Sequence, residues 1–252
     1  GTRRGRCRSS LRIMSDDRLY FRQLLAGRDF AQTDVIAGQM ANFSYLIGDR
    51  ETGECLVVDP AYDVDGLIAS AAVDDMTIAG ALVTHYHADH CGGSMMGFNL
   101  EGIEALLNRV QVPIHVQETE VEWISKTTGV TAPDLVGHRT GAHVMIGDVR
   151  VDLIHTPGHT PGSQCFLVHD HLVSGDTLFL EGCGRTDLPG GNAEDLYYSL
   201  TQRLAKVPDS AVLYPGHRYS AMPSAPMGET RAQNFVFRPQ SVEQWMMMFG
   251  NG

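Results

Sequence analysis

The sequence predicts a layered α/β fold in which helices lie outside the sheets. Short apolar runs of strand character alternate with helix-like stretches in both halves of the chain, and no repeat or linker divides them. Hydrophobic residues make up 43% of the 252 residues and charged residues 19%, a balance typical of a globular protein. We therefore expect a single domain over residues 14–252.

The first half of the chain begins with two predicted strands joined by turn residues. Residues 42–47 and 55–58 have strand character, and the Gly48-Asp49 and Thr52-Gly53 pairs between them favour turns. Apolar residues at helical spacing then predict a helix over residues 64–73. The following elements are a buried strand at 79–84, a helix opened by Gly92-Gly93, a strand at 114–116 and a helix at 118–126.

The second half of the chain shows the same mixture of short strands and helices. Strands are predicted at residues 149–155, 164–168, 171–174 and 211–214, and a helix at 193–206. A last helix is predicted around Trp245 and Phe249, with the run Met246-Met247-Met248 packing on the core.

Charge and apolar run length exclude several classes of partner. The formal net charge is −11, whereas nucleic-acid binding needs a basic face. The longest apolar runs are far shorter than the ~20 residues that span a bilayer. Residues 1–13 contain five arginines and no acid, and we interpret them as an extension outside the fold before a start at Met14. The alternative is a targeting presequence.

The cysteines indicate a reducing compartment. Their number is odd, and no CxxC pair or regular spacing suggests disulfides or a cysteine-rich zinc site. We therefore expect free thiols and a cytoplasmic protein. The five cysteines are Cys7, Cys55, Cys91, Cys165 and Cys183.

The strongest chemical signal is the run Thr84-His85-Tyr86-His87-Ala88-Asp89-His90, directly after a predicted strand. Imidazole and carboxylate groups are ligands for zinc, iron and manganese, and a loop at a strand end lets them converge. A surface loop that is histidine-rich by chance is the alternative. Three further strand ends carry a ligand type in a glycine turn: Gly158-His159-Thr160, Gly175-Asp176-Thr177 and Gly216-His217.

These motifs, in this order, resemble those of the metallo-β-lactamase superfamily over residues 40–220. The resemblance implies a four-layer αββα sandwich with metals at one edge of two packed sheets. It implies a first metal held by His85, His87 and His159, and a second held by Asp89, His90 and His217. Asp176 would bridge the two metals.

Such a centre would lower the pKa of a bound water and polarise a carbonyl group. Asp89 and Asp176 are therefore the predicted catalytic residues, with Asp89 acting as a base if one metal is bound. The alternative role for Asp89 is orienting a neighbouring histidine. A structural or storage site is disfavoured, because structural zinc sites close with four ligands, whereas seven are predicted here.

Residues 175–187 are similar to a stretch shared by glyoxalase II and the persulfide dioxygenases, which implies substrate contacts from Cys183, Arg185 and Asp187. Tyr219 is placed to reach the same pocket. Residues 188–191 resemble the shorter glyoxalase II-like hydrolases. The stretch after His217 lacks the long helical tail of glyoxalase II, so a thiol related to glutathione is the expected carrier.

The sequence therefore predicts a hydrolase that cleaves the thioester of a low-molecular-weight thiol by attack of a metal-bound hydroxide. One or two divalent ions are expected, zinc or iron, with manganese also compatible. The alternative is a dioxygenase acting on a persulfide, with one ferrous ion on His85, His159 and Asp176. The sequence leaves open whether the chain forms a homo-oligomer.

Overall fold

The strand-forming segments pair into two six-stranded sheets in a computed structural model that describes residues 18–250. In the first sheet the neighbouring strands β1, β2 and β3 are antiparallel, and the later strands pair in parallel, beginning on β3. The spatial order is β1 (Leu19–Leu25), β2 (Phe43–Asp49), β3 (Glu54–Val58), β4 (Thr77–Leu82), β7 (Ile114–Gln117) and β8 (Leu135–His138).

The second sheet is antiparallel except where β12 and β13 run parallel. Its order is β14 (Ala225–Pro226), β13 (Val212–Pro215), β12 (His171–Gly175), β11 (Gln164–Val168), β10 (Val149–His155) and β9 (His143–Ile146). A separate hairpin consists of β5 (Gly93–Met95) and β6 (Phe98–Leu100).

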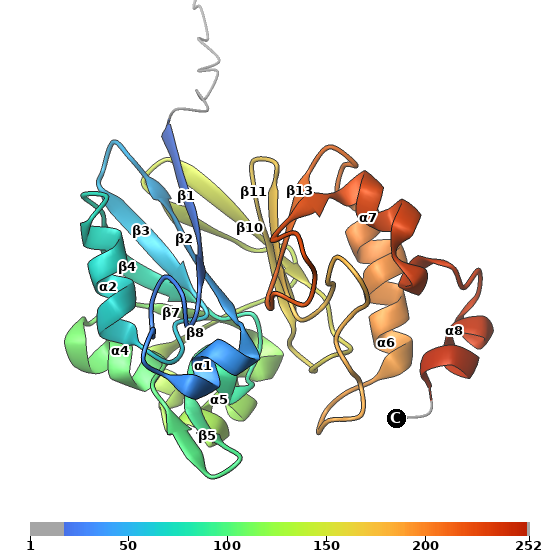
Figure 1. Cartoon of the computed structure of the whole chain (residues 1–252), viewed down its shortest axis with the longest axis horizontal. Coiled ribbons are helices and arrows are strands. Elements are labelled where there is room, and N and C mark those ends of the chain that lie inside the picture. Colours follow the sequence, from blue (N-terminus) through green and yellow to red (C-terminus); the bar gives the residue numbers. More distant parts are fainter. Residues whose placement is uncertain (1–17, 251–252) are drawn as a thin grey trace, which may run out of the picture.

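Helices cover the outer face of each sheet (Figure 1). On the first sheet these are α2 (Val64–Ala72), α4 (Ile103–Arg109) and α5 (Val121–Thr128). On the second they are α6 (Ala193–Tyr198), α7 (Met227–Gln233) and α8 (Val242–Phe249). Two further helices are short, α1 (Val35–Met40) and α3 (Ala88–Cys91), and α3 contains Asp89 and His90 of the predicted metal motif.

Three buried apolar clusters separate the four layers. One lies between the first sheet and its helices, one between the two sheets, and one between the second sheet and its helices. Strand β2 is buried along its whole length and serves two of them. Tyr45 and Ile47 point between the sheets, whereas Leu46 points toward the helices, because side chains alternate along a strand. The αββα architecture expected from the motifs is therefore confirmed.

Most predicted elements are present, with one clear error. Gly92-Gly93 was expected to open a helix, but Gly92 ends α3 and Gly93 begins the β5–β6 hairpin. Both glycines have positive φ, +87° and +113°, which suits a turn and not a helix start. The expected helix at 193–206 is helical throughout, but its second part is a π-helical segment, Ser199–Arg203, followed by a 3₁₀ turn, Leu204–Lys206.

The C-terminal helix corrects a second expectation. Helix α8 is present, and Trp245 is buried with its indole N–H donating to the Ala193 carbonyl at 2.7 Å. The methionines do not pack in the core, since Met247 is 77% and Met248 56% exposed. In an eight-residue helix only one stripe can face the protein, and Trp245 occupies it.

The cysteines agree with the sequence prediction where they can be seen. Cys55, Cys91 and Cys165 are buried free thiols, and Cys183 is a half-buried one. Cys7, the rest of residues 1–13 and Met14 lie outside the described residues. Within residues 18–250, no helix combines the length and apolar character needed to cross a membrane.

Candidate metal centre

The predicted ligands follow the ends of four strands at one edge of the sandwich. His85–His90 follow β4, His159 lies in the turn after β10, Asp176 follows β12, and His217 follows β13. The turn before Asp176 depends on Gly175, whose φ is +50°. A Cβ at Gly175 would lie 2.7 Å from the Cβ of Thr84, so a larger residue would separate the two loops.

The structure brings all seven predicted ligand residues together as two groups of three around one carboxylate. Donor atoms of His85, His87 and His159 lie within 4.8 Å of one another, and so do those of Asp89, His90 and His217.

The remaining residue, Asp176, lies between the two groups. Its carboxylate oxygens are 3.4 Å from His90 Nε2, 3.7 Å from His159 Nε2 and 3.3 Å from His217 Nε2. Asp176 also groups with His85 of the first set and His90 of the second, which suits a ligand shared between two metal ions.

Two buried nitrogen atoms in this cluster have no hydrogen-bond partner among the described residues, His85 Nε2 and His87 Nε2. A buried polar atom without a partner is costly, and a metal ion is a partner that imidazole nitrogen readily takes. His87 also directs its Nδ1 toward His159 Nε2 at 3.0 Å, so this nitrogen faces the cluster. The residues present therefore fit divalent metal ions.

Backbone carbonyls fix two of the histidine rings. His159 Nδ1 donates to the Arg185 carbonyl at 2.7 Å, and His217 Nδ1 donates to the Met40 carbonyl at 2.9 Å. Because a carbonyl only accepts, the proton sits on Nδ1 in both rings. Nε2 is then the atom of each ring that can bind a metal.

Asp59 orients a third ring and was missed by the sequence analysis. Its carboxylate accepts from His90 Nδ1 at 2.8 Å and from both the backbone N–H and the hydroxyl of Thr84, each at 2.7 Å. The side chain is 3% exposed. A usable signal was present, because Asp59 is an acid directly after the buried strand β3, the same pattern that marks the ligands.

Asn42 holds Asp89 and was also missed. The Asn42 amide donates to the Asp89 backbone carbonyl at 3.0 Å and to its carboxylate at 3.1 Å. Tyr62 in turn donates its hydroxyl to the Asn42 side-chain oxygen at 2.8 Å. These partners lie 47 and 20 residues from Asn42 in sequence, so no local pattern marks them.

A third missed residue, Glu120, ties two motif loops together. It is 1% exposed and accepts from the Tyr86 backbone N–H at 2.9 Å, the Thr160 hydroxyl at 2.6 Å and the Gly162 N–H at 2.6 Å. The first partner belongs to the His85–His90 loop and the other two to the His159 loop. Glu120 therefore fixes the relative position of the ligands that these loops carry.

Burial and neighbouring charges set the protonation of the cluster. Burial and the neighbouring His159 lower the pKa of His87 to about 4, so its imidazole is neutral and able to bind a metal at neutral pH. Burial opposes charge on His217 as well, but the Asp176 carboxylate outweighs it and raises the pKa of His217 to about 9. A metal at His217 must displace this proton, so its affinity falls as the pH falls.

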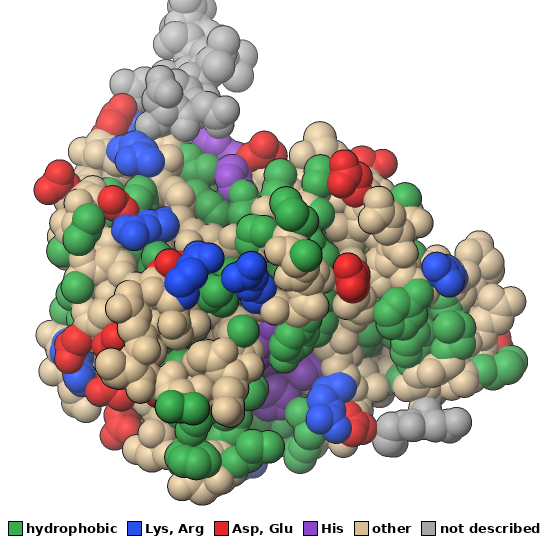
Figure 2. All heavy atoms as spheres, viewed as in Figure 1, with side chains coloured by type: hydrophobic (Ala, Val, Ile, Leu, Met, Phe, Trp, Pro, Cys, Tyr) green, Lys and Arg blue, Asp and Glu red, His purple; other side chains and the backbone are tan. Residues whose placement is uncertain are grey.

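The cluster opens into a cavity of about 660 Å³, within the range typical of ligand sites. Histidine side chains reach the surface between the two halves of the molecule, bordered by hydrophobic side chains (Figure 2). Tyr219, a predicted substrate residue, lines this cavity and stacks on His217 with ring centroids 4.7 Å apart.

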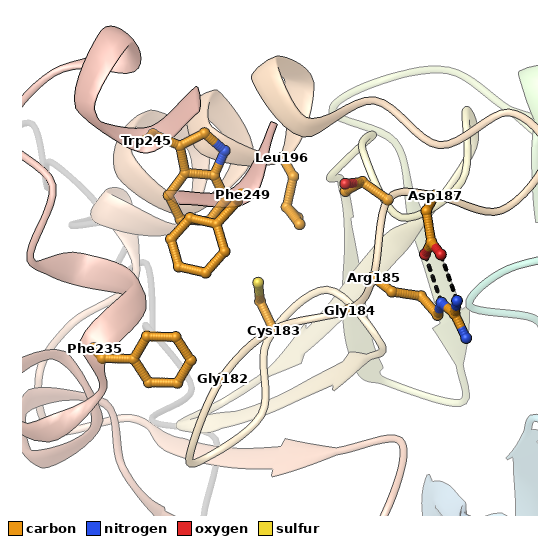
Figure 3. Close-up of a pocket in the computed structure, with 10 residues that line it drawn as sticks. Gly182, Cys183, Gly184, Arg185, Asp187, Leu196, Phe235, Trp245 and Phe249 are labelled. Carbon is orange, nitrogen blue, oxygen red and sulfur yellow. Dashed lines mark hydrogen bonds and ion pairs between the residues drawn. The ribbon is translucent and has the colours of Figure 1, made fainter. Parts of the chain in front are cut away.

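Two of the other predicted substrate residues, Cys183 and Arg185, line both this cavity and a second one of about 350 Å³. The sulfur of Cys183 points into the second cavity, toward Leu196 and Phe249 (Figure 3). Burial raises the pKa of Cys183 to about 12, so the thiol is neutral. Arg185 is paired with Asp187 through its Nε at 2.6 Å, and Asp187 lines only the second of these cavities.

This fold and this cluster define a metal-dependent enzyme with a two-part His/Asp centre. Residues 37–217 match the family model of the Metallo-beta-lactamase superfamily, and the chain belongs to that superfamily. The family expected from the motifs is therefore confirmed.

Three known proteins are similar over most of their length. The probable polyketide biosynthesis zinc-dependent hydrolase BaeB of Bacillus velezensis is 30% identical over 206 residues, 82% of this chain and 86% of that protein. The human mitochondrial persulfide dioxygenase ETHE1 is 28% identical over 245 residues, 91% of this chain and 86% of that protein. The crystal structure of ETHE1 from Myxococcus xanthus aligns with a TM-score of 0.74 at 30% identity, covering 92% of this chain and 90% of that one.

Proposed function

We propose that this protein is a metal-dependent hydrolase that cleaves the thioester of a low-molecular-weight thiol, giving a carboxylate and the free thiol. The observation that carries the proposal is the position of Asp176 between two complete three-residue groups. Two adjacent metals are a common arrangement in hydrolytic enzymes. The similarity to a protein described as a zinc-dependent hydrolase supports the same class.

In this proposal His85, His87 and His159 hold one ion, Asp89, His90 and His217 hold the other, and Asp176 lies between them. Bound divalent ions, zinc or iron, supply Lewis acidity that activates water and polarises a carbonyl group. Every other contribution comes from the chain itself.

Two side chains of the cavity, Asp89 and Tyr219, have protonation states that suit roles beside the metal ions. Burial opposes ionisation of Asp89, but His90 and His217 lower its pKa well below the usual range, so it remains ionised. The carboxylate can therefore serve as a metal ligand, and it would act as a base only if a single metal is bound. Burial raises the pKa of Tyr219 to about 12, so its phenol keeps its proton and can donate a hydrogen bond to a substrate oxygen or to the leaving thiolate.

A second candidate is an iron-dependent persulfide dioxygenase. It is favoured by the similarity to the human persulfide dioxygenase, which spans nearly the whole of both chains. In this case His85, His159 and Asp176 would hold a single iron. The two candidates differ in metal stoichiometry, oxygen use and products.

One pair of assays separates them. Purified protein is loaded with zinc or iron, its metal content is measured, and thiol release from a panel of thioesters is compared with oxygen uptake on a thiol persulfide. Thiol release without oxygen uptake supports the hydrolase, and oxygen uptake with sulfite release replaces it by the dioxygenase. His159→Ala is expected to abolish either activity, while the exposed His143→Ala is the matched control.

Asp176→Ala tests the site itself. Loss of the central carboxylate is expected to remove both metal occupancy and turnover. A variant that kept full turnover would contradict the site assignment. We also propose that the protein is cytoplasmic, on the basis of the buried free thiols, which cell fractionation would test.

A further inference from the structure

The β5–β6 hairpin stands apart from both main sheets (Figure 1), and Ser94, Met95 and Met96 of this segment line the metal cavity. It begins two residues after Cys91, the last residue of α3, so it is attached directly to the metal motif. Its base is fixed, because a Cβ on Gly93 would lie 2.2 Å from the Thr127 carbonyl oxygen. Its tip is free, and Met96 is 89% exposed.

The hairpin provides an apolar wall of the metal cavity. Met95 and Met96 line the cavity from the hairpin, and Met40 and Tyr86 line it from the same half of the molecule. None of these four side chains carries a charge. An exposed methionine next to a catalytic cavity is adaptable apolar surface that a ligand can cover.

The opposite wall is polar as well as apolar. Glu181, Arg185 and Tyr219 line it from the second half of the chain. Among the described residues that line this cavity, Arg185 is the single lysine or arginine, and Asp187 already neutralises it. The two walls therefore suit different parts of one substrate, an apolar part on the hairpin and a polar part opposite.

We propose that the hairpin selects the acyl group, and that the substrate carries an aliphatic acyl chain lying on Met95 and Met96. This inference rests on the proposed thioester hydrolysis and names its substrate class. The thiol end, with its amide groups, then lies toward Tyr219 and Arg185. Methionine thioethers suit a flexible chain, because they adapt their shape without requiring a hydrogen-bond partner.

The test uses acyl thioesters of N-acetylcysteamine, a small neutral thiol, with acetyl, butanoyl, hexanoyl and octanoyl groups. For the metal-loaded wild type we expect kcat/KM to rise by up to about fourfold for each methylene that the hairpin covers. Met95→Ser is expected to lower the octanoyl-to-acetyl ratio of kcat/KM by at least about fivefold. Met96→Ser, at an exposed position that does not endanger folding, is expected to lower it as well.

Met247→Ser is the matched control. It makes the same substitution at a methionine that is 77% exposed on α8 and does not line the metal cavity, so the ratio is expected to stay that of the wild type. A second readout does not depend on turnover. The S-octyl thioether of N-acetylcysteamine cannot be hydrolysed, and calorimetry should show that it binds the wild type more tightly than Met95→Ser.

The outcomes distinguish a failure of acyl-chain selection from a failure of the proposed thioester hydrolysis. Equal kcat/KM for all chain lengths, or ratios unchanged in both hairpin variants, overturns the selection of an aliphatic chain and leaves thioester hydrolysis standing. If a protein confirmed to hold metal cleaves none of the thioesters, the proposed hydrolase fails and this inference fails with it.

Discussion

Replacing Asp59 by Asn tests whether the second group of ligands depends on a correctly protonated histidine. In the wild type the carboxylate accepts from His90 Nδ1 and from the backbone N–H and hydroxyl of Thr84. Asparagine can accept with only its oxygen. If that oxygen stays on the Thr84 N–H, the amide NH₂ faces His90 and places the ring proton on Nε2, which then cannot bind a metal.

The opposite amide orientation is also unfavourable. It returns an acceptor to His90 but sets the amide NH₂ against the buried N–H of Thr84, which then has no acceptor. An unsatisfied buried donor costs about 1–3 kcal/mol, equivalent to roughly 5- to 150-fold in an equilibrium constant. Loss of an outer partner of a metal-binding histidine typically costs about 10–100-fold in metal affinity. We therefore expect Asp59→Asn to weaken the metal held by Asp89, His90 and His217 by about 10–100-fold.

The measurement is competition for zinc against a chromophoric chelator, which resolves two classes of bound metal. The metal held by His85, His87 and His159 should be weakened less, because Asp59 reaches this group only through the Thr84 hydroxyl, which lies 3.0 Å from His85 Nδ1. Asp75→Asn, at an exposed position, is the control, and circular dichroism checks that both variants are folded. If Asp59→Asn binds both metals as tightly as the wild type, the assigned role of Asp59 is wrong.

Three further predictions concern separate parts of the molecule. Glu120→Ala leaves the buried N–H groups of Tyr86 and Gly162 without an acceptor, whereas the Thr160 hydroxyl can still pair with Ser163. The free energy of unfolding should therefore fall by about 2–6 kcal/mol in urea titrations, and Glu120→Gln, which can still accept two of the three bonds, should lose about 1–3 kcal/mol. An unchanged midpoint in both variants would show that the buried network is dispensable. Asp187→Asn removes the partner that neutralises Arg185. It should lower the KM for a glutathione thioester, which carries carboxylates, more than the KM for a neutral N-acetylcysteamine thioester. An equal effect on both KM values would refute the conclusion that Asp187 neutralises Arg185. Burial would raise the pKa of Asp49, but the Arg18 guanidinium and backbone N–H groups hold this pKa below its usual range. The stabilisation is therefore fully present above the unfolded pKa of about 3.9 and is lost as the pH falls from there through the lower, folded pKa. Denaturation of Asp49→Asn should therefore show a weaker loss of stability below pH ~4 than the wild type.

The ligand residues could be predicted from sequence because their chemistry is dense and their position is local. Three histidines and an aspartate fall within residues 85–90, and each later ligand follows a glycine at a strand end. Strand ends at one edge of a sandwich converge, so recognising the strands is enough to predict that the ligand residues lie close together. The structure places all seven in one cluster, and their role as ligands stays a prediction that metal analysis must test.

The residues that orient the ligands could not be found in the same way. Asn42, Glu120 and Tyr62 act through partners far away in the chain, and in sequence Glu120 cannot be distinguished from its exposed neighbour Glu118. The hairpin was missed for a different reason. A Gly-Gly pair is compatible both with the turn before a helix and with the turn into a hairpin. The hairpin is the one that packs closely against the Thr127 backbone, a contact that is far away in sequence.

The distribution of ligands between the sheets has a consequence for folding. Each group of three takes two residues from the first half, after β4, and one from the second half, His159 or His217. Neither group is complete until the two sheets have packed, so metal binding favours the packed state over the unfolded chain. At a free metal concentration 100 times the dissociation constant, this stabilisation is about 2.7 kcal/mol, or roughly 5–10 °C in Tm for a chain of this size. A chelator should therefore lower the Tm of the wild type by this amount. The double variant His159→Ala/His217→Ala, which retains ligands from one half only, should already unfold near the chelated wild type and respond little to the chelator. An equal drop in both proteins would mean that one half binds metal alone, and the proposed coupling between metal binding and sheet packing would be wrong.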